Sequence, residues 1–240
     1  MCTPIKKQVE WTLDENFMKK IYKSLYNDSD EIAGKIFFED HSCNKNTCNK
    51  KIKDYTISRG NGSSVLTPFG IVNFHTHPKI AYEGENAKYG WPSGEDMRQS
   101  LEFADHGCLV HLVFTLEGIY VINVLKTDLK TKDRKVLEKV LKMTHVFRSN
   151  DQKKQSKNFR TFLKSKDSRT TLSTWINLVN NLTLKELYKL YNSFDDKKIN
   201  LTSKLDENKI FNVKLVKNSP IVKFKANFID AKCHYKSFYG

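Results

Sequence analysis

The sequence predicts an α/β fold in which a mixed sheet is flanked by helices, followed by a C-terminal α+β extension. Apolar runs typical of strands recur between residues 7 and 124, and stripes of apolar residues with helical spacing precede and follow them. Strands enclosed by helices in this way favour a layered α/β domain. Residues 148–166 then turn polar and rich in lysine, which is typical of a linker or a solvated helix. We therefore expect a domain over 1–147 and a basic extension over 148–240.

The first domain is expected to alternate strands and helices. Asp14 is a typical N-cap for a helix that ends before Glu31, and Ser93 is a typical N-cap for a second helix that closes near Gly107. Residues 109–115 and 119–124 are expected to pair as a hairpin across a short turn. The other predicted elements are strands over 7–13, 31–39, 52–58 and 70–77 and a helix over 131–146.

The extension is predicted to contain two helices followed by a hairpin. Residues 172–194 carry two apolar stripes with helical spacing, and the second stripe opens at Thr183. Residues 209–216 and 221–228 alternate apolar residues with lysine, and the turn signal Asn218-Ser219-Pro220 lies between them. No motif in this part assigns chemistry, although its basic surface could dock a protein partner.

The high net charge does not by itself assign a class of binding partner. The 240 residues are 39% hydrophobic, which is enough for a substantial core. A formal net charge of +14 could favour nucleic acid, anionic lipid or acidic proteins. Lysine far outnumbers arginine, however, and no nucleic-acid-binding signature is present. A solvated lysine-rich surface is therefore the favoured interpretation, and nucleic acid binding is kept as an alternative.

The cysteines and the apolar runs indicate a reduced, intracellular and cytoplasmic protein. Five irregularly spaced cysteines do not form a disulfide framework, and the first residues lack the apolar core of a secretory signal. No apolar run reaches the roughly 18 residues of a membrane span. His41, Cys43 and Cys48 could hold a second metal, but the fourth ligand is missing, so an exposed loop with free thiols is favoured.

The most informative stretch runs from residue 70 to residue 101. His75 and His77 alternate at the end of a predicted strand, so both imidazoles leave the same face. Asp96 lies in the first turn of the second predicted helix. Two neutral imidazoles and a carboxylate supply the three protein ligands that a catalytic zinc takes while its fourth position stays open to water. We therefore expect one zinc per chain, bound by His75, His77 and Asp96.

Each of these residues also has a plain structural interpretation. Ser93 and Asp96 match a capping box, in which the two residues satisfy the first amides of a helix. The two histidines could be structural. Glu31, at the start of an apolar strand, could pair with a lysine, since an unpaired buried carboxylate is costly. These residues occur together, in the order and on the strands and helices that a metal site requires, which favours a common site over coincidence.

The arrangement resembles that of the JAMM (MPN-plus) zinc metalloproteases over about the first 140 residues. The motifs that carry the resemblance are Glu31-x-x-Gly34, His75-x-His77-Pro78 and Ser93-x-x-Asp96. The resemblance implies a cytidine-deaminase-like JAMM/MPN sandwich in which the histidines and Asp96 bind zinc, Glu31 acts as general acid/base and Ser93 supports the reacting oxygen. The connection between His77 and Ser93 is longer than is usual in that family, so residues 79–90 are expected to protrude as a loop beside the metal.

The resemblance also implies an activity. Members of the family hydrolyse isopeptide bonds that join ubiquitin or a ubiquitin-like modifier to lysine, and some cleave ordinary peptide bonds. The same zinc-dependent isopeptidase or protease activity is expected here, with a bound water and with ubiquitin-like conjugates as partners. The composition, the inserted loop and the unfamiliar extension resemble JAMM proteins of large DNA viruses, which would place the protein in the host cytoplasm or the virion.

Three alternatives stay open. A catalytically silent MPN-type interaction protein could keep the fold and dock through its basic surface. A His-x-His metallohydrolase of the polymerase-and-histidinol-phosphatase type would need further histidine and aspartate ligands later in the chain. Two histidines and a carboxylate can also bind non-haem iron.

Overall fold

The computed structural model describes residues 6–44, 47–60, 64–85, 87–145, 172–194, 199 and 205–229. Its elements are, in chain order, β1 (Lys6–Leu13), α1 (Glu15–Asn27), β2 (Ile32–Cys43), β3 (Thr47–Arg59), β4 (Val72–Thr76), α2 (Lys79–Glu85), α3 (Gly94–Asp105), β5 (Val110–Phe114), β6 (Ile119–Val124), α4 (Thr131–His145), α6 (Leu172–Asn180), α7 (Leu184–Phe194), β7 (Phe211–Val216) and β8 (Val222–Ile229). Within these residues no helix has the length and apolar character needed to cross a membrane.

The strands of the described residues form one mixed sheet with helices on both faces, which confirms the predicted α/β class. The strand order is β7-β6-β5-β4-β2-β3-β1-β8. β4 pairs in parallel with β5 and antiparallel with β2, so it lies inside the sheet, where backbone and side chains are shielded from water. All five residues of β4 are buried. The segment that carries the two predicted histidine ligands is therefore held rigidly on both sides.

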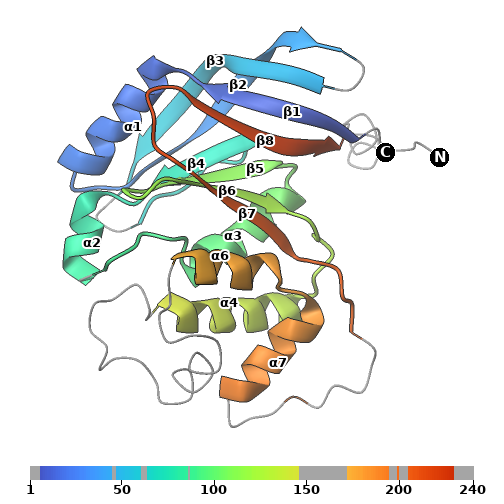
Figure 1. Ribbon diagram of the computed structural model, residues 1–240. Coiled ribbons are helices and arrows are strands. Elements are labelled where there is room, and N and C mark those ends of the chain that lie inside the picture. Colours follow the sequence, from blue (N-terminus) through green and yellow to red (C-terminus); the bar gives the residue numbers. More distant parts are fainter. Residues whose placement is uncertain are drawn as a thin grey trace.

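Each face of the sheet has its own hydrophobic core. α1 packs on one face through an apolar side that includes Phe17 and Ile21, which meet Phe74 and neighbouring strand residues. Asp14 caps this helix as expected, because its carboxylate accepts a hydrogen bond from the Phe17 amide at 2.9 Å. α3, α4, α6 and α7 gather on the other face (Figure 1). Trp91 and Trp175 stack in the core of that face. Asp96 lies on this second face, because it belongs to α3.

The predicted C-terminal hairpin is wrong, although both of its strands exist. β7 pairs antiparallel with β6 at one edge of the sheet, and β8 pairs antiparallel with β1 at the other. The alternating sequence pattern fixes the strand type but not the partner, and both edges offered an unpaired strand. The two strands thus extend the sheet built by the first part of the chain. The predicted domain boundary at residues 147 and 148 lies outside the described residues.

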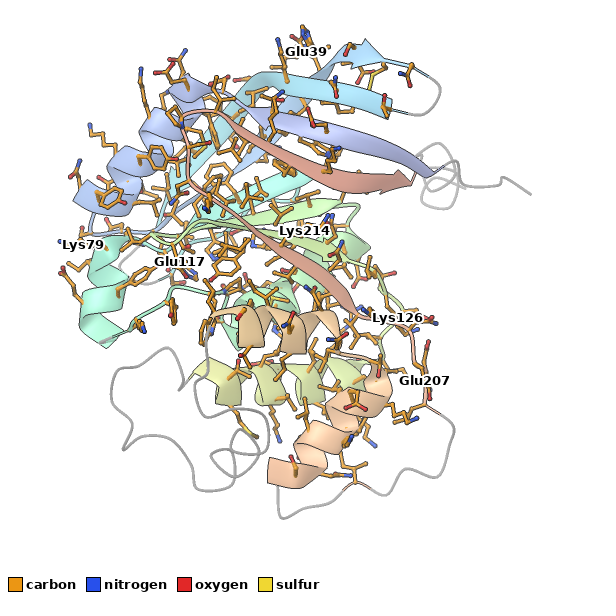
Figure 2. The ribbon with its side chains drawn as sticks, in the orientation of Figure 1. Glu39, Lys79, Glu117, Lys126, Glu207 and Lys214 are labelled. Carbon is orange, nitrogen blue, oxygen red and sulfur yellow. A yellow bond between two sulfur atoms is a disulfide. The ribbon has the colours of Figure 1, made fainter. Side chains whose placement is uncertain are left out.

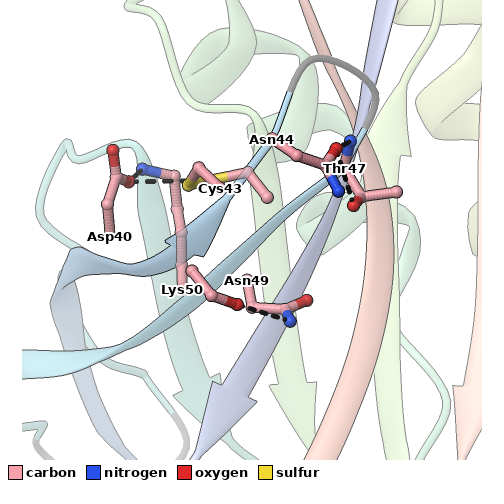
Figure 3. The surroundings of a disulfide bond; sticks show 8 residues. Asp40, Cys43, Asn44, Thr47, Asn49 and Lys50 are labelled. Atoms are coloured by element: carbon pink, nitrogen blue, oxygen red, sulfur yellow. Dashed lines mark hydrogen bonds and ion pairs between the residues drawn. A yellow bond between two sulfur atoms is a disulfide. The ribbon is translucent and has the colours of Figure 1, made fainter.

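In the segment over 41–50, expected to be an exposed loop with free thiols, the described residues belong largely to two paired strands. β2 extends to Cys43 and β3 begins at Thr47, and Cys43 faces Cys48 across the pair. The two cysteines form a disulfide, beside which Lys50 contacts Asp40 (Figure 3). The expectation of reduced cysteines fails here because the hairpin register brings the two sulfurs together. Both sulfurs are in a covalent bond, so they are not thiolate ligands for a second metal.

The segment after His77, expected to protrude as a loop, contains a short helix that packs partly against the rest of the protein. It forms the short helix α2, whose Tyr82 is buried, while Ile80 and Lys79 stay exposed. Figure 2 shows Lys79 on the outer side of α2 and Glu117 between α2 and the sheet. The hydroxyl of Tyr82 donates to the Glu117 carboxylate at 2.6 Å, which ties the insertion to the turn between β5 and β6.

Gly34 on β2 tests the close approach of β2 to β3 and to Phe74. A Cβ atom there would lie 1.8 Å from the Thr56 carbonyl oxygen and 2.8 Å from the ring of Phe74. The first contact is with paired backbone, which cannot rotate away. We expect Gly34→Ala to lower the free energy of unfolding by about 1–3 kcal/mol, the usual cost of overpacking, as measured by urea unfolding.

Gly84→Ala is the matched control, because a Cβ atom at Gly84 meets nothing within 4 Å and the residue lies in α2. This variant should gain about 0.4–1 kcal/mol from the reduced freedom of the unfolded chain. Equal unfolding midpoints for the two variants would contradict the close approach of β2 and β3 at Gly34.

Candidate metal centre

One residue in a strand, one directly after that strand and one residue in a helix lie close together on one face of the sheet. His75 lies near the end of β4 and His77 directly after it, where the His77 amide donates to the Phe114 carbonyl at 2.9 Å and so follows β5. Asp96 lies in the first turn of α3. One ligand atom from each of the three residues lies within 4.8 Å of the others. The structure thus brings together the three predicted metal ligands.

The separations between the donor atoms are similar to those between neighbouring ligands of one metal ion. The Nε2 atoms of His75 and His77 are 3.0 Å apart, Nε2 of His75 lies 3.4 Å from Asp96 Oδ1, and Nε2 of His77 lies 3.5 Å from Asp96 Oδ2. Bonds of about 2.0–2.1 Å to zinc place neighbouring tetrahedral ligands about 3.3–3.4 Å apart. Two of the separations are close to this value and the third is slightly shorter. The triad could therefore hold a metal ion.

Burial and neighbouring groups set the protonation states of His75 and Asp96 to those that a cation needs. Both imidazoles are buried, and burial lowers the pKa of His75 to about 4, so its ring is neutral at pH 7. Burial alone would raise the pKa of Asp96. The neighbouring charges of His75 and His77 and hydrogen bonding outweigh it and hold the pKa of Asp96 well below its usual range. A neutral His75 beside an ionised Asp96 carboxylate leaves negative charge in the site, which attracts a divalent cation.

Hydrogen bonds on the far side of each imidazole turn Nε2 toward the centre. Nδ1 of His77 lies 2.7 Å from the Gly90 carbonyl oxygen, which can only accept, so this nitrogen carries the proton. Nδ1 of His75 lies 3.0 Å from Nε2 of His111. Metal-binding histidines almost always make such a second hydrogen bond, which fixes the ring and its tautomer.

The capping box predicted for Ser93 and Asp96 is formed. The Asp96 amide donates to Ser93 Oγ at 3.1 Å, and the Ser93 amide donates to Asp96 Oδ2 at 2.6 Å. Gly94 allows the start of α3 to approach α4, because a Cβ atom there would lie 2.6 Å from the Lys142 backbone nitrogen. The structural interpretation of this pair is thus confirmed, and it serves the metal interpretation, since the cap fixes the Asp96 carboxylate. The Ser93 hydroxyl proton stays available for donation.

Glu31 lies directly before β2 and is half-buried. Its carbonyl accepts a hydrogen bond from the Gly60 amide at 2.8 Å. The pairing of β2 with β4 ends at Ala33, opposite His75. Continuing this antiparallel register two residues beyond the strand ends would set Glu31 opposite His77, on the face of the sheet that carries both histidines. The structure does not include Glu31 in the cluster of candidate ligands itself.

Sequence reasoning missed the residues that surround the ligands. His111 lies on β5, and its hydrogen-bond partners are the candidate ligand His75 and Asn73. The only sequence signal was a histidine inside an apolar strand beside the predicted ligand strand. Glu117, read as part of a turn, accepts hydrogen bonds from the Gly90 amide at 2.8 Å and from Tyr82 at 2.6 Å. It thereby holds the peptide whose carbonyl orients His77.

The other histidines do not extend the cluster among the described residues. His106 is exposed, and its ring stacks on Phe69 with centroids 4.1 Å apart. Within the described part of the chain, the group of potential metal ligands beside β4 contains only His75, His77 and Asp96, and a second group, Asp40, Cys43 and Cys48, contains the two disulfide-bonded cysteines. The side chain of His145 and all of His234 lie outside that part. This arrangement does not favour the multi-histidine metallohydrolase alternative.

Comparison with known proteins adds little. No protein-family model matches the sequence, and no solved structure matches it. A protein named "Uncharacterized protein 3R" of Frog virus 3 (isolate Goorha) is 36% identical over 67 residues. The similar stretch spans 28% of this chain and 15% of that relative. A match of this extent does not establish a family, and the printed name of the relative assigns it no activity.

Proposed function

We propose that this chain is a JAMM-type zinc metalloprotease that hydrolyses isopeptide or peptide bonds and removes ubiquitin or a ubiquitin-like modifier from lysine. The proposal rests on one observation above all. Two imidazole nitrogens and two carboxylate oxygens meet at separations of 3.0, 3.4 and 3.5 Å. The imidazoles come from the end of β4 and the carboxylate from the start of α3. Burying such a cluster of polar donors is costly unless the donors have partners, and a bound cation would supply one partner to all three residues.

The residues present fit the group that the proposal requires. His75, His77 and Asp96 would hold the zinc, and three protein ligands leave a fourth position for water or substrate. Zinc, when bound, would polarise the scissile carbonyl and lower the pKa of water from 15.7 toward about 7. The mixed nitrogen and oxygen donors suit zinc, although non-haem iron uses the same types, so metal analysis decides between the two.

The chain's own groups account for the proton transfers. The Glu31 carboxylate would take the proton of the attacking water and pass it to the nitrogen of the leaving amine, which must depart protonated. The Ser93 hydroxyl, whose oxygen already accepts a hydrogen bond from the Asp96 amide, would donate a hydrogen bond to the developing oxyanion. Loss of one such donor typically costs about 2.7–4 kcal/mol of transition-state stabilisation. No cysteine nucleophile is needed for this mechanism.

The proposal is tested with a panel of diubiquitins and a panel of ubiquitin-like conjugates, each incubated with the purified full chain. We expect cleavage of at least one linkage, its loss on addition of a metal chelator and its return with added zinc, as followed by gel electrophoresis. A folded chain that carries zinc but cleaves none of these conjugates would contradict the isopeptidase proposal. Salt-sensitive binding of DNA without cleavage would instead favour an interaction protein.

A further inference from the structure

A buried chain of hydrogen bonds runs away from His75 on the side opposite the candidate metal. His75 Nδ1 lies 3.0 Å from His111 Nε2, and His111 Nδ1 lies 2.7 Å from Asn73 Oδ1. Asn73 Nδ2 in turn donates to the Pro68 carbonyl oxygen at 3.2 Å. His75, His111 and Asn73 are all buried, so water does not compete for these bonds. The mechanism proposed above uses neither His111 nor Asn73.

The register of two parallel strands creates this chain. Asn73 and His75 alternate on β4, and Asn73 pairs with His111 on the adjacent strand β5. The three side chains therefore share one face of the sheet. The rings of His75 and His111 lie nearly parallel, with centroids 5.0 Å apart and planes 24° apart, while Phe103 of α3 packs against His111 at 5.1 Å. Packing and pairing together fix where the His111 ring lies.

The donor and acceptor of each hydrogen bond in this chain follow from the group at its end, the Pro68 carbonyl. The Pro68 carbonyl can only accept, so the Asn73 amide nitrogen faces it and the Asn73 oxygen faces His111. The same oxygen accepts the Cys108 thiol at 3.3 Å, which agrees with this orientation. An amide oxygen can only accept, so His111 carries its proton on Nδ1. Nε2 of the neutral His111 ring is then an acceptor, and His75 must donate from Nδ1.

The consequence appears at the metal side of His75. A neutral imidazole that holds its proton on Nδ1 presents an unprotonated Nε2. His77 reaches the same state by a different route, since its Nδ1 donates to a backbone carbonyl of Gly90. For His75 the corresponding acceptor is a side chain, which mutation can remove without changing the backbone.

We propose that His111, oriented by Asn73, is a positioning residue that holds His75 with its Nε2 lone pair directed at the metal. This inference rests on the proposed metal centre and deepens it. Outer-shell partners of ligand histidines typically contribute 10–100-fold to metal affinity. The same contribution is expected here, and it is expressed in metal binding itself rather than only in turnover.

The test compares the zinc affinity of three variants by competition with a chromophoric chelator. His111→Leu removes the acceptor and should weaken zinc binding 10–100-fold. His111→Gln offers a side-chain oxygen that can reach the position of Nε2, so its affinity should stay within a few-fold of the wild type. His106→Gln, at an exposed histidine, is the control and should leave affinity unchanged. A folded His111→Leu protein with wild-type zinc affinity would overturn the positioning role while leaving the metal centre intact.

A second measurement needs no variant. Nitrogen-15 NMR of the imidazoles in the wild-type, metal-free protein should find the protons of His75 and His111 on Nδ1. A proton on His75 Nε2 would overturn the inference whatever the zinc affinities are. Failure of the wild type to bind any zinc, with these two tautomers observed, would instead contradict the proposed metal centre and leave the hydrogen-bond chain established.

Discussion

His75→Ala and His77→Ala are each expected to abolish stoichiometric zinc binding. Each substitution removes one of three protein donors from a buried cluster whose remaining atoms cannot move in to replace it, because strand pairing fixes β4 and the capping box fixes Asp96. The loss should exceed the 10–100-fold effect of an outer-shell change, since a direct bond to the metal is removed. Elemental analysis of purified, dialysed protein measures the metal content per chain.

The control is His106→Ala, because His106 is exposed and stacks only on an exposed ring of Phe69. This variant should keep one zinc per chain. Circular dichroism and thermal unfolding confirm that the variants are folded, which matters because the histidines are buried. One zinc per chain in a folded His75→Ala protein would end the assignment of the triad. Stoichiometric iron in the wild type would support the triad as metal ligands but identify the metal as iron rather than zinc.

The ligands could be predicted because short-range rules place them. Alternation along a strand puts His75 and His77 on one face, and the start of a helix follows from the capping signal of Ser93 and Asp96. These rules act within a few residues and need no knowledge of the tertiary fold. They hold even though α2 lengthens the connection between His77 and Ser93, because the insertion docks through Tyr82 and returns the chain to α3.

The features that the sequence did not predict depend on contacts between distant residues. β7 and β8 have the pattern of strands, but only the free edges of the sheet decide that β7 joins β6 and β8 joins β1. Cys43 and Cys48 meet because β2 and β3 run further than their apolar patterns indicate. His111 acquires its partner through the parallel pairing of β4 with β5, for which a single histidine in an apolar run is no signal.

The second large effect concerns Glu31, which should be essential for turnover but not for metal binding. We expect Glu31→Gln to keep one zinc per chain and to lower kcat on a cleaved diubiquitin by about 10²–10⁴-fold, the usual contribution of a general acid–base. The amide of glutamine has nearly the shape of the carboxylate but cannot accept the proton of water. The measurement pairs elemental analysis with steady-state kinetics, so that lost chemistry is separated from a lost metal.

Glu83→Gln supplies the matched control for this prediction. Glu83 is an exposed carboxylate on α2, where it lies 3.4 Å from Lys79, and its replacement should leave kcat and zinc content unchanged. Glu31 differs because it directly precedes β2, where continuing the β2–β4 register past Ala33 and His75 would set it opposite His77, on the face that carries the ligands. If Glu31→Gln loses its zinc, Glu31 supports the metal rather than the proton transfer. If it retains both zinc and wild-type kcat, another group moves the proton, and the register alone does not make this carboxylate the base.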